Sequence, residues 1–397
     1  MKMSLAEYLS YVPDDLIVEI LSRLPVKDLM RFRCVCKTWK SIIFDPSFVK
    51  KHLERSSKKI HLIITREEVL YDGFDYDYGD AYAIPYSINQ LFENPSSDVD
   101  EDDYYQLNGY WIIGSCNGLV CLGGYHGEED TIYEYWVQFW NPATRMKSRK
   151  SPRLHVNPCC QGFDPSNSIG FGFLYDDLSA IYKVVSVLSN CRSKKTEVWV
   201  YNLGGNCWKN IFSCPNFPIL RQNGRLVNGT INWLAIDMSS SHYEERNDII
   251  DPLVIFSVDL QKDTYKYLLL PKGLDQIPDN DQLRIVELRD RLCLYHDRNA
   301  THFVVWQMRE FGVEKSWTLL MKVTYNHLQI PYPPDRPLLP FCISENGEVL
   351  MLVNNDVLNM TFYNRRNNRV EVIPIPNNNA WWQATNYIPS LVSPFQN

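Results

Sequence analysis

The sequence predicts an α+β multidomain protein, in which a small all-α module of three to four short helices precedes an all-β, propeller-like domain of six, partly irregular blades. Apolar residues at helical spacing between residues 11 and 53 predict the helices. A high aromatic content (13%, with 24 Tyr and 11 Trp) and recurring short strands after residue 110 predict the β domain. We place the two domains at residues 8–55 and 58–397.

Prolines and aspartates delimit the helices of the first module. Pro13 suits the first turn of a helix that we expect to end at Pro25, and the pair Asp45-Pro46 is expected to start the last helix. Helices of two or three turns are marginal alone, and a module of about 43 residues buries too little surface to be stable by itself. We therefore expect an exposed apolar face, which is typical of a protein–protein site.

A weak repeat of strands predicts the blades. Each unit holds an apolar strand, such as GLVCLGG or YKVVSVL, followed by an aromatic-rich strand. The aromatic anchors of the successive units are Trp140, Tyr201, Phe256, Trp306 and Tyr363. Residues 60–65 and the C-terminal ATNYIPSLVSP are expected to complete a sixth blade from both ends of the chain, which removes the sheet edges. The polar, acidic residues 66–108 are predicted to form loop.

Charge and cysteine usage limit the function classes. The net charge of the chain is −7, which disfavours binding of a polyanion over the whole surface. Residues 1–59 carry 12 Lys/Arg and 7 Asp/Glu, so a local basic patch is compatible with the sequence. The 11 cysteines form no CxxC pair, which favours reduced thiols in an intracellular protein. No signal peptide or apolar run of 18 residues is present, so we expect a cytoplasmic or nuclear location without a membrane.

Catalytic motifs are weak. The run Gly114-Ser115-Cys116-Asn117-Gly118 has the outline of a nucleophile elbow with Cys in place of Ser. Such an elbow leads into a helix, but the strand LVCLGG follows, so a structural turn is favoured. We expect no catalytic residue, no cofactor and no metal site.

Two sets of motifs resemble plant F-box proteins. Residues 13–42, with RLPV at 23–26 and RFRCVCKTW at 31–39, resemble the F-box. GSCNGLVCL, FWNPATR, GFGF with YKVV, and SLVSP resemble the F-box-associated, kelch-type domain that is also found in the S-locus F-box group. The resemblance implies a substrate receptor of an SCF ubiquitin ligase. Its partners would be a Skp-type adaptor, a cullin scaffold reached through the adaptor, and a protein substrate that the sequence does not identify.

The resemblance assigns adaptor binding to the apolar residues of the helices. These residues are Pro13, Leu16, Ile17, Ile20, Leu21, Leu24, Pro25, Val26, Leu29, Phe32, Val35, Cys36, Trp39 and Ile42. Two alternatives stay open: an enzyme on a propeller scaffold, and a DNA-associated regulator using the basic residues 26–59. DNA binding is disfavoured because the third helix offers few side chains that read bases. We expect a non-catalytic receptor.

Overall fold

We describe the protein from a computed structural model of the chain. The residues described are 13–56, 61–71, 76–87, 104–127, 132–157, 169–190, 193–215, 217–220, 223–237, 253–274, 283–299, 301–330, 338–344, 348–352, 359–374 and 381–395. In this part of the chain, every helix lacks the length and apolar character needed to cross a membrane.

Four short helices form the N-terminal module. They are α2 (Asp14–Leu21), α3 (Val26–Phe32), α4 (Lys37–Phe44) and α5 (Pro46–Ser56). Asp14 and Asp15 lie in the first turn of α2, where negative charge is favourable. The predicted boundary at Pro25 is wrong, because α2 ends at Leu21 and Pro25 immediately precedes α3. Proline suits that position since the first amides of a helix have no intrahelical acceptor.

The rest of the described chain forms six antiparallel sheets. The first sheet has the strand order β25 (Trp381–Tyr387), β1 (His61–Tyr71), β2 (Tyr76–Ser87), β3 (Tyr105–Gln106). The second has the order β4 (Trp111–Cys116), β5 (Leu119–His126), β6 (Tyr133–Asn141), β7 (Met146–Lys147), and β8 (Leu154–Val156) also pairs with β6. The third consists of β9 (Ile169–Asp176), β10 (Ile181–Asn190), β11 (Lys195–Asn202) and β12 (Lys209–Pro215). The fourth sheet consists of β13 (Arg225–Val227), β14 (Thr230–Ile236), β15 (Leu253–Asp259) and β16 (Thr264–Leu269). The fifth consists of β17 (Arg284–Leu288), β18 (Arg291–Arg298), β19 (His302–Met308) and β20 (Trp317–Thr324). The sixth consists of β21 (Leu339–Ile343), β22 (Glu348–Leu352), β23 (Asn359–Asn364) and β24 (Arg369–Pro374). A short 3₁₀ helix, Glu314–Ser316, precedes β20.

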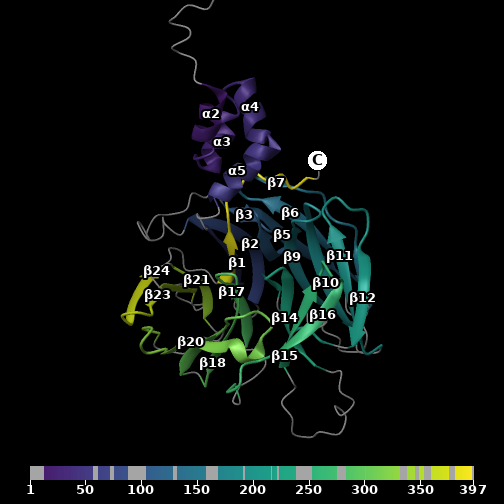
Figure 1. Cartoon of the computed structure of the whole chain (residues 1–397), viewed down its shortest axis with the longest axis vertical. Helices are drawn as coiled ribbons and strands as arrows, with labels where there is room; N and C mark the ends of the chain where they lie inside the picture. The colour runs from purple at the N-terminus through teal and green to yellow at the C-terminus, as the bar shows by residue number, and fades with distance from the viewer. Residues whose placement is uncertain are drawn as a thin grey trace, which may run out of the picture.

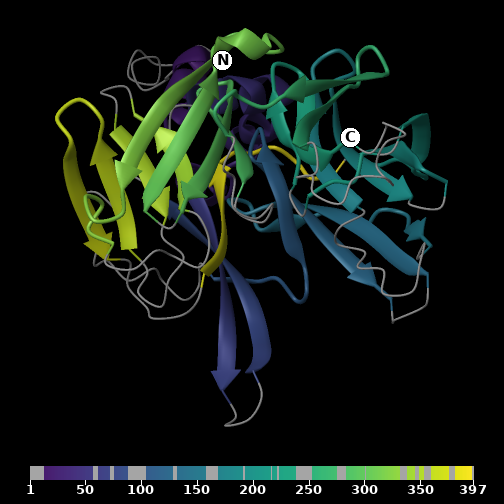
Figure 2. The ribbon, with the colours of Figure 1, turned by 90° about the horizontal axis from the view of Figure 1, so that it is seen from below.

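The sheets are the blades of a propeller, as predicted. Figure 2 shows them arranged around a common centre. All five aromatic anchors lie on the third strand of a blade, namely β6, β11, β15, β19 and β23. Five hydrophobic clusters each join two adjacent blades, so that burial between blades holds the ring together.

Both ends of the propeller sequence meet in one blade. β25 pairs with β1, with Ile63 opposite Thr385, which confirms the predicted closure of the ring. The SLVSP residues of the predicted closing segment lie beyond this strand. The loop prediction for residues 66–108 is wrong in part, because β1 and β2 form a long hairpin there and β3 extends the blade. These residues form strands because they pair with neighbouring strands, although their polar, acidic sequence shows no strand periodicity.

Candidate functional site

The helical module lies on one edge of the propeller, with α5 next to the blades and the other helices beyond it (Figure 1). Side chains cap the starts of two of its helices, α4 and α5. Cys36 Sγ accepts a hydrogen bond from the Trp39 amide at 3.4 Å at the start of α4. Asp45 Oδ1 accepts from the amides of Ser47 at 2.9 Å and Phe48 at 3.3 Å at the start of α5. These caps satisfy amides that short helices leave unpaired.

An ion cluster joins the first and last helices. Both carboxylate oxygens of Glu19 on α2 accept from Arg55 Nη2 on α5, at 2.8 Å each. Arg23 and Lys51 contact the same carboxylate at 2.7 and 3.1 Å. Hydrogen bonds from Arg55, Arg23 and Lys51 hold the pKa of Glu19 at about 2. The cluster fixes α2 against α5 and neutralises part of the basic charge on which DNA binding would depend.

The core of the module includes a residue from the far end of the chain. Its buried side chains are Leu21, Val26, Leu29, Ile43, Phe48 and Leu391. Leu391 is 3% exposed and belongs to the C-terminal segment that passes beside α5 (Figure 1). The sequence predicts Leu21, Val26 and Leu29 on the adaptor-binding surface. The structure instead buries all three in the core of the module.

The remaining residues of the predicted adaptor set lie at or near the surface. Leu16 and Ile20, one turn apart on α2, are 54% and 57% exposed, and Val35, in the turn before α4, is 63% exposed. Pro13, Pro25 and Cys36 are also exposed, and Ile17, Leu24, Phe32, Trp39 and Ile42 are half-buried. Sequence reasoning missed Phe44, which is 39% exposed at the end of α4, since its helical position falls beside Lys40 and Ser41.

A buried asparagine attaches the C-terminal segment to the propeller. Asn141, at the end of β6, is fully buried, and its Nδ2 donates to the carbonyl oxygens of Ser390 at 3.0 Å and Val392 at 2.7 Å. The amide of Ala143 donates to the Tyr387 hydroxyl at 3.0 Å. Ala143 itself packs against the core of the helical module. Asn141 and Ala143 thus contact the C-terminal segment around Leu391, between the helices and the propeller. We call this contact site the C-terminal seat.

The turn after β4 completes the C-terminal seat. Asn117 and Gly118 have φ of 47° and 79°, the left-handed conformations of a tight hairpin turn. A Cβ on Gly118 would lie 2.0 Å from Ser390 Oγ and 2.8 Å from the Ile388 carbonyl oxygen. Only glycine leaves room for the C-terminal segment here. Three motifs far apart in the sequence, SCNG, WNPA and SLVSP, therefore meet at one junction.

The elbow-like run is a hairpin turn and not a strand-to-helix turn. Cys116 ends β4, and Asn117-Gly118 connects it to β5. Burial raises the pKa of the Cys116 thiol to about 12. The thiolate that a nucleophile requires is therefore disfavoured at neutral pH.

The comparisons with known proteins agree with this architecture. The profile of the F-box domain matches residues 9–51, and that of the F-box associated beta propeller domain matches residues 84–394. An F-box/kelch-repeat protein of Arabidopsis thaliana is 28% identical, with 96% of both chains covered. The F-box protein CPR1 of the same plant is 25% identical, over 96% of this chain and 88% of its own. The chain belongs to the F-box proteins that carry an F-box associated beta propeller domain.

Proposed function

We propose that this protein is the substrate receptor of an SCF-type ubiquitin ligase. The F-box, residues 8–55, binds a Skp-type adaptor and through it a cullin, and residues 58–397 hold a protein that is to be ubiquitinated. The chain itself performs no chemistry, because holding a substrate near the ubiquitin donor raises its local concentration there. The eight described cysteines are free thiols, which supports an intracellular, cytoplasmic or nuclear, location.

The exposed apolar residues of the F-box are the observation that carries this proposal. Leu16, Ile20 and Val35 are all more than half exposed although the module has its own core. We infer that the adaptor covers them together with the half-buried residues of the predicted set. Apolar surface that a protein keeps exposed without use for its own fold is typical of an interaction site.

The C-terminal seat gives the receptor a defined geometry. Leu391 lies in the F-box core, while Asn141 of the propeller holds the backbone on both sides of Leu391. A substrate on the propeller is thereby kept at a set distance from the adaptor. Transfer between two bound groups is most efficient when their separation is fixed within the reach of the reaction.

The adaptor interface is tested by removing its apolar side chains. We expect Leu16→Ala with Ile20→Ala to weaken binding of the purified full chain to a Skp-type adaptor roughly 30- to 1,000-fold. This corresponds to about 1–2 kcal/mol for each side chain that is no longer buried. Isothermal titration calorimetry measures the effect, and affinity capture with the proteasome blocked would show whether a cullin accompanies the adaptor.

Leu178→Ala is the matched control. Leu178 is 80% exposed in the turn between β9 and β10, so its truncation removes an exposed leucine away from the F-box. Binding that is unchanged in this control but lost in the double variant supports the proposal. Undiminished adaptor binding by the double variant would refute the interface, and no binding by the unmodified chain would refute the receptor role.

A further inference from the structure

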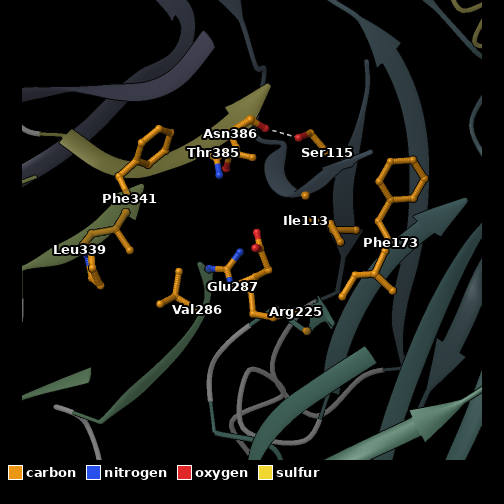
Figure 3. A pocket seen from close by; sticks show the side chains of 14 residues that line it. Ile113, Ser115, Phe173, Arg225, Val286, Glu287, Leu339, Phe341, Thr385 and Asn386 are labelled. Atoms are coloured by element: carbon orange, nitrogen blue, oxygen red, sulfur yellow. Dashed lines mark hydrogen bonds between the residues drawn. The ribbon is translucent and has the colours of Figure 1, made fainter. Parts of the chain in front are cut away.

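A cavity of about 140 Å³ lies at the centre of the propeller, where the innermost strands of all six blades meet. Each innermost strand, or the residue next to it, contributes to the wall: β4, β9, β13, β17, β21 and β25. Figure 3 shows the side chains around this space. An apolar cavity of about 150 Å³ in another protein admits benzene, so this volume suits a compact molecule and is larger than a single water requires.

The polar groups of the cavity are incompletely paired. Arg225 Nε is buried and has no hydrogen-bond partner, and the same holds for Asn386 Oδ1 and Thr385 Oγ1. An arginine keeps its positive charge in proteins even where burial lowers its pKa, as it does here. Buried polar atoms normally have partners, because leaving one unpaired costs its desolvation free energy.

The one carboxyl group among the described wall residues leaves Arg225 Nε without a hydrogen bond. Glu287 lies near Arg225 in the cavity (Figure 3), but its Oε1 accepts a hydrogen bond at 2.5 Å from the amide of Asp290. Burial raises the pKa of Glu287, while the hydrogen bond from the Asp290 amide and the positive charge of Arg225 act in the opposite direction. A bound anion would accept the hydrogen bond that Arg225 Nε does not give to Glu287.

Ser115 also lines the cavity, and its hydroxyl donates to the Asn386 carbonyl oxygen. Most of the other wall side chains are apolar. Ile113, Phe173, Val286, Leu339 and Phe341 surround the polar groups. Arg225 and Glu287 lie together in Figure 3, whereas Asn386 and Thr385 lie across the space from them. A complementary ligand therefore has an anionic group at one end, a small apolar body, and a hydrogen-bond donor for Asn386 Oδ1.

We propose that the central cavity binds a small organic acid with one carboxylate, a short branched apolar body and a hydroxyl or amino group. The carboxylate pairs with Arg225, and the hydroxyl or amino group donates to Asn386 Oδ1. A ligand there touches all six blades, so binding stabilises the closed ring by mass action. This proposal does not depend on the receptor role, since it concerns the propeller alone.

A matched series of probes separates the interactions. Isovalerate has the carboxylate and the branched body, 2-hydroxyisovalerate and valine add a donor, and isovaleramide replaces the carboxylate by a neutral amide. We expect 2-hydroxyisovalerate or valine to bind the full-length protein with a Kd of roughly 0.1–1 mM, as ligands of about eight non-hydrogen atoms do. Isovalerate should bind several-fold more weakly, and isovaleramide at least about tenfold more weakly. Saturation-transfer NMR and calorimetry measure these affinities.

Two variants test the place of binding. Arg225→Gln removes the charge and should weaken the best probe by at least about tenfold. Gly114→Val adds a side chain to the cavity wall, where a Cβ meets only Phe173 Cβ, at 3.9 Å, and it should abolish binding even if Arg225→Gln fails to fold. The proposal is overturned if no probe binds at millimolar concentration, if the amide binds as well as the acids, or if a folded Gly114→Val protein binds unchanged.

Discussion

The two sides of the F-box differ in what covers them. The side that faces the propeller is closed by Leu391, so the end of the chain completes a core that begins with α2. Leu16, Ile20 and Val35, in contrast, are more than half exposed. Residues of the same apolar kind and the same helical spacing thus serve folding on one side and, as proposed, binding on the other. A module too small to be stable alone thus takes one core residue from the far end of its own chain and still leaves apolar residues exposed.

Truncation of Leu391 should have the largest effect on the F-box. Leu391→Ala deletes a side chain that is 3% exposed, and we expect it to cost about 2–5 kcal/mol of the stability of the F-box. Trp39 reports on the F-box, because it packs edge-on against Phe32 at 5.5 Å between ring centroids and the other ten tryptophans lie beyond residue 110. Thermal unfolding followed by ¹⁹F NMR of fluorotryptophan-labelled protein separates the two domains. The Trp39 signal should be lost at a lower temperature, with the propeller signals nearly unchanged; a shift of both domains by the same amount would mean that the F-box has no separate core.

The hydrogen bonds of the C-terminal seat should matter next. Asn141→Ala leaves the carbonyl oxygens of Ser390 and Val392 without their donor, and we expect a loss of about 1–3 kcal/mol in the attachment of the C-terminal segment. Hydrogen exchange by mass spectrometry should show faster exchange in residues 388–395 and in α5. Asn141→Asp is the control, since it keeps the shape but places a carboxylate against two carbonyl oxygens, and it should be at least as damaging. Unchanged exchange in both variants would show that the seat does not hold the segment.

Much of this architecture follows from the sequence for a physical reason. Each blade needs a buried third strand, so the anchors Trp140, Tyr201 and Phe256 recur at the spacing of the blades. The β1–β2 hairpin escaped prediction because its acidic, tyrosine-rich sequence shows no period and β25 from the other end of the chain pairs with β1. The division of the F-box surface also escaped prediction. Helical periodicity places both Leu21 and Ile20 on the apolar face of the helix. It does not show that Leu391 packs against the core that contains Leu21.

Acid should loosen the F-box through Glu19. Its pKa is held at about 2 by Arg55, Arg23 and Lys51, below the ordinary value of 4.5. A carboxylate with a lowered pKa in the folded state stabilises the fold above its unfolded pKa, and this contribution is lost as the pH falls from 4.5 towards 2. We expect the melting temperature of the Trp39 signal to fall over this range more than that of Glu19→Gln, whose amide does not titrate. High salt should reduce the difference, and identical pH profiles would exclude the ion cluster as a stabilising contact.

The smallest expected effect on stability comes from truncating the exposed residues Leu16 and Ile20. Leu16→Ala with Ile20→Ala should change the stability of the F-box by less than about 0.5 kcal/mol for each substitution, because both side chains are already more than half exposed. The same Trp39 signal measures this, with Leu391→Ala as the destabilised reference. A variant that folds normally and yet no longer binds the adaptor would assign the two sides to two different tasks. A loss of stability as large as that of Leu391→Ala would instead show that Leu16 and Ile20 belong to the core of the F-box, and the proposed interface would then need other residues.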